Sequence, residues 1–84
     1  MVYALIVCRS LTYAQRAAAV LERSGISAVI LRTPKRLTAK GCSYSVKIST
    51  RRLAEAKAAL EEAAIRPQAL FTLLDSGAYE EVPL

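Results

Sequence analysis

Strand and helix patterns follow one another along this chain in an order that few folds accommodate. Apolar residues at helical spacing predict helices over about residues 12–24 and 51–64. Runs of apolar β-formers, one of them alternating with polar residues, predict four strands, at residues 2–7, 27–32, 44–48 and 69–74. The order β-α-β-β-α-β is that of the ferredoxin-like α+β fold, an antiparallel sheet with two helices on one face. Right-handed connections then make the first and third strands antiparallel neighbours at the centre of the sheet.

Local signals set the expected ends of these elements. Thr12 followed by Gln15 fits a capping box for the first helix, and Gly25 supplies its C-terminal stop. Ser49 or Thr50 is the expected cap of the second helix. Beyond the fourth strand, residues 76–77 begin a tail that we expect to add a short segment at the sheet edge.

The length of 84 residues predicts one domain, with a core over about residues 2–74 and an acidic tail over 75–84. No apolar run approaches the roughly 20 residues of a membrane span, and the apolar start lacks a preceding basic region. We therefore expect a cytoplasmic protein. A chain this short builds a thin core, so a homodimer is one way in which it could gain stability.

The absence of histidine removes several kinds of chemistry. A Ser-His-Asp or Cys-His apparatus within one chain is excluded, and two cysteines alone do not make a tetrahedral zinc site. We expect neither a metal nor a cofactor. Without a secretory signal, the two cysteines are expected to be reduced thiols.

The net charge of +5 is unevenly distributed. No acidic residue occurs between Arg23 and Ala54, whereas the tail after Leu74 is acidic. This asymmetry is compatible with RNA, an acidic protein or an anionic substrate as partner, and also with a solvated loop that binds nothing. The aromatic-glycine signature of RNA-binding ferredoxin-like sheets is absent from the third strand.

Topology brings the two thiols to the same end of the sheet. Cys8 closes the first strand and Cys42 opens the third, so antiparallel pairing places them together. The first helix begins at this end, and Arg9 and Lys40 lie close to the cysteines in sequence. A cationic setting at a helix N-terminus lowers a thiol pKa and increases the thiolate fraction.

The two cysteines have different surroundings in the sequence. Cys42 lies between Gly41 and Ser43 at the mouth of a polar loop, where glycine permits another molecule to approach closely. Both a reactive thiol and a strand-end cysteine without chemistry fit this pattern. Cys8 continues a buried apolar run, which favours a packing role. A redox pair of the two thiols would require Cα atoms within about 7 Å.

Several short motifs occur in a characteristic order, at residues 3–7, 9–10, 21–26, 34–35 and 41–42. In this order they resemble the selenium/sulfur carrier protein-like family of small bacterial domains. The resemblance covers about residues 2–74 and implies that Cys42 corresponds to the family's characteristic cysteine. The chain departs from the family pattern at Ser43, where members often have glycine, and in a loop about one residue longer.

The resemblance implies a carrier that holds sulfur or selenium as a persulfide on Cys42, a co-substrate rather than a catalyst. A donor such as a cysteine desulfurase would supply the atom, and an acceptor protein would receive it. Arg9 and Lys40 would stabilise the anion. The cations of the preceding loop would dock the partner, namely Arg32, Lys35 and Arg36. The alternative hypothesis is a basic module that binds RNA or an acidic protein, in which the thiols are incidental.

Overall fold

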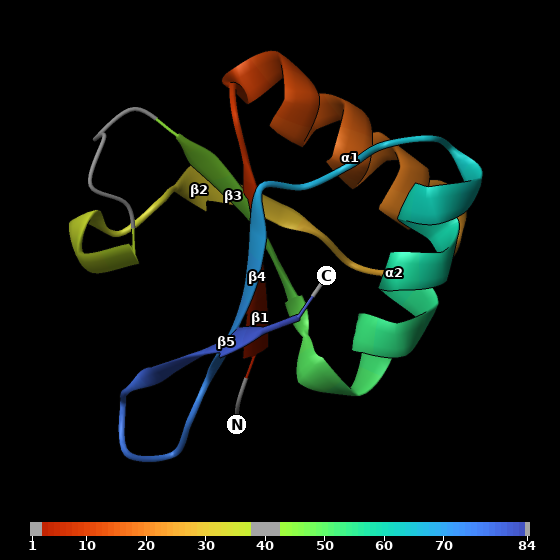
Figure 1. The fold of residues 1–84 in the computed structure, drawn as a ribbon. Coiled ribbons are helices and arrows are strands. Elements are labelled where there is room, and N and C mark those ends of the chain that lie inside the picture. The colour runs from red at the N-terminus through yellow and green to blue at the C-terminus, as the bar shows by residue number, and fades with distance from the viewer. Residues whose placement is uncertain (1–2, 38–42, 84) are drawn as a thin grey trace.

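The computed structural model describes residues 3–37 and 43–83. A single antiparallel sheet has the strand order β2-β3-β1-β4-β5, and both helices lie on one of its faces (Figure 1). The elements, in chain order, are β1 (Tyr3–Cys8), α1 (Leu11–Arg23), β2 (Val29–Arg32), the 3-10 turn η1 (Lys35–Leu37), β3 (Tyr44–Ser49), the 3-10 turn η2 (Thr50–Arg52), α2 (Leu53–Glu62), β4 (Ala69–Leu73) and β5 (Tyr79–Val82). None of the described helices is long and apolar enough to cross a membrane.

The central pairing of β1 with β3 confirms the predicted ferredoxin-like core. Tyr3 is the register partner of Ser49, and Cys8 is the partner of Tyr44. The structure extends the expected four-stranded arrangement by β5, which pairs with β4 and forms the edge opposite β2. The tail beyond β4 is therefore part of the sheet, as its turn signal suggested.

The hydrophobic core lies between the sheet and the helices. Alternate residues of the central strands face it, among them Ile6, Val46 and Leu70. The contribution of α1 is largely alanine, which lets the helix approach the sheet closely, and Leu21 fills its C-terminal end. Burial of these apolar side chains supplies the main favourable free energy of folding.

The first helix begins one residue earlier than predicted, and its cap differs. Ser10, not Thr12, is the N-cap, and its Oγ accepts a hydrogen bond from the Tyr13 amide at 3.2 Å. The prediction of Thr12 as the cap was wrong because β1 continues to Cys8. Only Arg9 and Ser10 then remain to connect the strand to the helix.

Both helices end in the same hydrogen-bonded motif but with different residues. After α1 the amide of Ile26 donates to Leu21, with Gly25 at φ +82°. After α2 the amide of Ile65 donates to Leu60, and the left-handed position is occupied by Ala64 at φ 59°. This is the Schellman arrangement, which glycine adopts without a steric cost and alanine does not.

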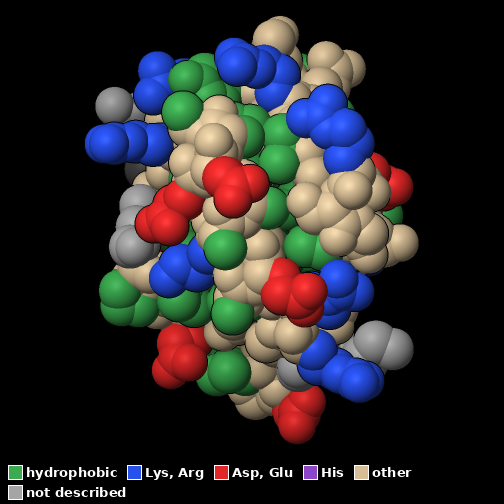
Figure 2. Space-filling view, turned by 90° about the vertical axis from the view of Figure 1, so that its right-hand side faces the viewer, with side chains coloured by type: hydrophobic (Ala, Val, Ile, Leu, Met, Phe, Trp, Pro, Cys, Tyr) green, Lys and Arg blue, Asp and Glu red, His purple; other side chains and the backbone are tan. Residues whose placement is uncertain are grey.

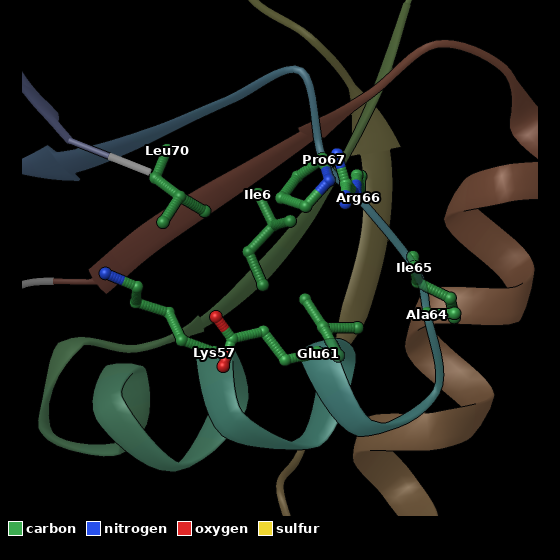
Figure 3. A pocket seen from close by; sticks show the side chains of 9 residues that line it. Ile6, Lys57, Glu61, Ala64, Ile65, Arg66, Pro67 and Leu70 are labelled. Atoms are coloured by element: carbon green, nitrogen blue, oxygen red, sulfur yellow. The ribbon is translucent and has the colours of Figure 1, made fainter.

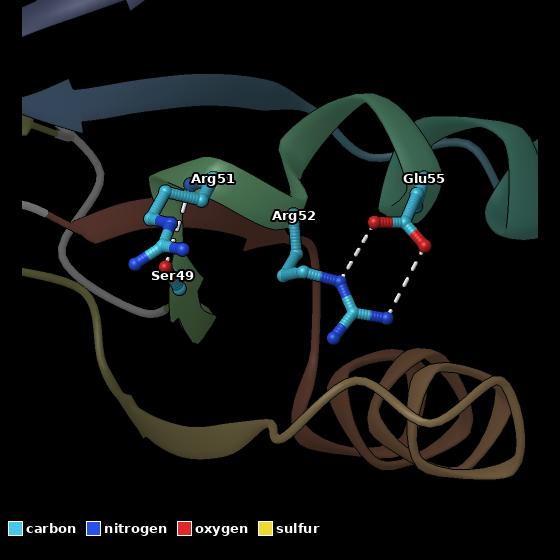
Figure 4. A network of polar contacts seen from close by, with 4 residues as sticks. All are labelled: Ser49, Arg51, Arg52 and Glu55. Atoms are coloured by element: carbon cyan, nitrogen blue, oxygen red, sulfur yellow. Dashed lines mark hydrogen bonds and ion pairs between the residues drawn. The ribbon is translucent and has the colours of Figure 1, made fainter.

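The α-helix of the second predicted segment is shorter than expected because a 3-10 turn precedes it. Ser49 is confirmed as the cap of that turn, accepting from the Arg51 amide at 3.4 Å. Arg52 then forms two hydrogen bonds with the Glu55 carboxylate, at 2.7 and 3.2 Å (Figure 4). The positive charge that opposes the dipole of α2 is thus neutralised within the helix's first turn.

The sheet face opposite the helices is also partly buried. Leu5 and Val7 point to this face and are 1% and 4% exposed, although neither helix reaches them. The turn η1 lies on this side of the sheet (Figure 1). The chain segment after β2 therefore runs on the side of the sheet away from α1 and α2.

Candidate functional site

The predicted site lies at the end of the sheet where β1 finishes and β3 begins. Gly41, Cys42 and Lys40 lie outside the described residues, so their roles stay predictions. Ser43, the next residue, immediately precedes β3, whose first residue pairs with Cys8. Ser10, which caps α1, follows Cys8 by two residues. The described flank of the site thus lies beside the N-terminus of α1, as the topology predicted.

Three hydroxyl side chains form a buried polar cluster beside this flank. The Oγ1 of Thr33 and the Oγ of Ser45 are 2.7 Å apart and hydrogen-bonded. The amide of Thr33 donates to the carbonyl of Ser43 at 3.1 Å, which extends the pairing of β2 with β3 by one step. Ser43 is 6% exposed, and its own Oγ has no hydrogen-bond partner among residues 3–37 and 43–83. A buried hydroxyl without a partner is uncommon in folded proteins.

Cys8 belongs to the hydrophobic core and not to the surface of the site. Its side chain is 1% exposed and lies on the helix-bearing face, in the same cluster as Ile6. Burial raises the pKa of this thiol from 9.0 to about 11. The packing role predicted for Cys8 agrees with this position, and at neutral pH the thiol is fully protonated.

Arg9, the described cation of the predicted anion site, is held against a tyrosine ring. The guanidinium carbon of Arg9 is 4.9 Å from the centre of the Tyr13 ring, and Arg16 approaches the same ring at 5.7 Å. Arg9 therefore lies at the expected end of the sheet, with its charge over α1. Tyr13 was not singled out from the sequence because its ring partners depend on the path of the chain after Cys8.

The three proposed docking cations have different surroundings. Arg32 lies over the ring of Tyr44, at 5.8 Å. Arg36 lies over Tyr79 of β5, at 5.3 Å. Lys35 is exposed. Their common use in docking a partner stays a prediction, and the contact of Arg36 with a residue 43 positions away (79 − 36) was not visible in the sequence.

The helix-bearing face does not carry a uniform positive charge. Figure 2 shows acidic side chains distributed among the basic ones on this face. The RNA-binding alternative places its basic surface on the loop after β2 and not over the helices, so it stays a prediction. Within the described residues there is also no group of three or more acidic or cysteine side chains that could hold a metal ion.

A pocket of about 490 Å³ opens between α2 and the sheet (Figure 3). Its floor is apolar and includes Ile6, Leu60 and Leu70, while Lys57 and Glu61 of α2 line its side. In the part of the chain that the structure describes, no cysteine or hydroxyl side chain lines it. This pocket was not predicted from the sequence, because its lining combines β1, α2, the segment after α2 and β4.

The described residues define a small α+β domain with a ferredoxin-like core, a buried thiol at Cys8 and a buried hydroxyl cluster at the start of β3. The family model described as "Putative Se/S carrier protein-like" matches residues 3–72. The chain belongs to this family. A search of curated proteins and a search of solved structures returned no match.

Proposed function

We propose that the protein carries sulfur or selenium as a persulfide or selenopersulfide on Cys42. Membership of the carrier-like family supports the type of function, since the match includes residue 42. The observation that carries the choice of thiol is the burial of Cys8. A carrier thiol must be reached by two partner proteins, and a side chain that is 1% exposed with a pKa of about 11 does not meet this requirement.

The transfer step needs no cofactor and involves no net oxidation. The Cys42 thiolate attacks the terminal sulfur of a persulfide on the donor, such as a cysteine desulfurase. A new S–S bond forms at Cys42, and the S–S bond of the donor breaks. The donor cysteine leaves as a thiolate, and the transferred sulfur keeps its proton or releases it to water. In the delivery step, a thiolate of the acceptor protein attacks the terminal sulfur of the Cys42 persulfide, and Cys42 leaves as a thiolate.

Two features support the site as an environment for the anion. The N-terminus of α1, capped by Ser10, directs its unpaired backbone amides towards the end of the sheet that leads to Ser43. Arg9 is exposed at the same end and lies only 4.9 Å from Tyr13, so its charge is held there. In the proposed function, both groups favour the thiolate over the thiol. The cytoplasm, where donor thiols stay reduced, is the proposed compartment.

Loading by a bacterial cysteine desulfurase supplied with L-cysteine tests the proposal. Intact-mass spectrometry is expected to show one added sulfur atom on the wild-type protein and on Cys8→Ala. The Cys42→Ser variant is expected to show none. The Cys8→Ala protein is the matched control, because it also lacks one thiol. Sulfur loading that persists in Cys42→Ser would overturn the proposal, and so would loading that is lost in folded Cys8→Ala.

A further inference from the structure

The last strand of the sheet lies beyond the residues that the family shares. The family match ends at residue 72, whereas β5 spans Tyr79–Val82. β5 pairs with β4 so that Val82 is opposite Leu70 and Tyr79 is opposite Leu73. Val82 packs against the core under the helices. Tyr79, three residues earlier, therefore projects to the other face, where no helix lies.

A residue from the opposite edge of the sheet reaches this tyrosine. Arg36 belongs to η1, which follows β2, and β2 and β5 are the two edge strands of the sheet. The guanidinium carbon of Arg36 nevertheless lies 5.3 Å from the centre of the Tyr79 ring. The contact therefore spans the helix-free face and joins η1 to β5.

Further contacts hold the ring that Arg36 covers. Burial and a hydrogen bond with Tyr3 raise the pKa of Tyr79, and the nearby Arg36 charge opposes this rise. Tyr3 lies on the same face, with Lys47 Nζ 5.0 Å from its ring centre. Tyr3 of β1 and Arg36 of η1 thus both approach Tyr79 on the helix-free face.

The segment that contains Arg36 leads directly to Cys42. Its N-terminal side is held by Thr33, which bonds to Ser43 and Ser45 on β3 and its flank. The turn itself is closed by a hydrogen bond from the Leu37 amide to the Pro34 carbonyl, at 2.9 Å. The Arg36 contact adds an attachment to β5, at the far edge of the sheet, to those that hold the root of the segment on β3.

We propose that Arg36 and Tyr79 are positioning residues for Cys42: strand β5, by its contact with Arg36, fixes the segment from which the carrier thiol is presented. The effect on sulfur transfer at Cys42 rests on the proposed function. The role of Arg36 follows from the contact alone. Arg36 acts inside the molecule, on Tyr79, and does not serve primarily as a docking charge for the partner. Lys35, the exposed neighbour, keeps the docking role.

Hydrogen exchange of the Leu37 amide tests the contact without any sulfur chemistry. A cation over an aromatic ring at an exposed position stabilises by an amount that corresponds to about a two- to fivefold change in an equilibrium. Tyr79→Leu and Arg36→Gln should therefore each speed exchange of Leu37 by about that factor. Tyr79→Phe keeps the ring under Arg36 and loses only the hydroxyl that bonds to Tyr3, so its exchange should be slower than that of Tyr79→Leu. Lys35→Gln, with the same charge change as Arg36→Gln, should also leave exchange unchanged.

The rate of sulfur transfer from the charged desulfurase tests the consequence for Cys42. Tyr79→Leu and Arg36→Gln should each lower the maximal transfer rate about two- to fivefold, and Tyr79→Phe, which keeps the ring, should lower it less than Tyr79→Leu. The double variant should be no slower than either single variant, because both remove one interaction. Lys35→Gln should instead raise the apparent KM for the donor and weaken its salt dependence.

Two outcomes would overturn the inference. One is unchanged Leu37 exchange in folded Tyr79→Leu. The other is an additive double variant in which Arg36→Gln raises KM as Lys35→Gln does, because Arg36 would then be a docking charge. If no variant and not even the wild type accepts sulfur, the proposed function fails, while the exchange measurement still decides whether β5 holds the segment.

Discussion

The chemical inertness of Cys8 in the native protein is a consequence of its place in the core, and it can be measured alone in Cys42→Ser. With a pKa of about 11 instead of 9.0, the thiolate fraction of Cys8 at pH 8 falls from about 9% to about 0.1%. Because the thiolate is the nucleophile, ionisation alone slows alkylation about a hundredfold. The 1% exposure of the side chain slows it further, since the reagent reaches sulfur only when the core opens.

Iodoacetamide labelling followed by intact-mass spectrometry supplies the assay. Native Cys42→Ser at pH 8 should alkylate at least about a hundred times more slowly than the same protein unfolded in urea. The unfolded sample is the matched control, because it contains the same single thiol without its environment. A native rate within tenfold of the unfolded rate would refute the assignment of Cys8 to the core and reopen the hypothesis of two reactive thiols.

Three further predictions concern stability. The raised pKa of Cys8 stabilises the fold fully below pH 9, and this contribution is lost as pH rises from 9 to 11, because only the unfolded thiol ionises there. Urea titrations should show about 3 kcal/mol of such loss that Cys8→Ala lacks, and a pH dependence equal in both proteins would contradict it. Ala64→Gly should raise the unfolding free energy by about 0.5–1 kcal/mol, whereas Gly25→Ala should lower it by a similar amount, since both positions have positive φ and a Cβ at Gly25 meets no atom within 4 Å. A loss of stability in Ala64→Gly, or a gain in Gly25→Ala, would exclude backbone strain as the cause. Thr33→Val should cost about 1–3 kcal/mol because it leaves the buried Ser45 hydroxyl without its 2.7 Å partner. Adding Ser45→Ala should recover part of this cost, and a purely additive double variant would contradict the pairing.

The order and pairing of the strands could be predicted because they follow from periodicity. The alternation of Tyr44, Val46 and Ile48 with polar residues indicated which face of β3 is buried, and the structure places Val46 and Ile48 in the core. The right-handed connection rule then placed β3 beside β1. These features depend on residues close in sequence and on general chirality, so one chain suffices to derive them.

The site could be predicted only in its location. The end of the sheet near Ser43 follows from topology, but the ring under each cation does not. Arg9 contacts Tyr13 four positions away, and Arg36 contacts Tyr79 across the whole sheet. The first contact depends on a helix start that the Thr12 pattern placed wrongly. The second depends on the path of the chain after β2, which crosses the sheet to the edge segment β5, and no local signal encodes that path.

The central claim, that Cys42 and not Cys8 carries the chalcogen, is tested most directly by locating the persulfide on the wild-type protein. Trypsin separates the two thiols, since cleavage after Arg9 and after Lys40 places Cys8 in residues 1–9 and Cys42 in residues 41–47. After loading by the charged desulfurase and alkylation of the persulfide, the added sulfur should appear on the peptide of residues 41–47 alone. Added sulfur on the peptide of residues 1–9, or on neither peptide, would contradict the account.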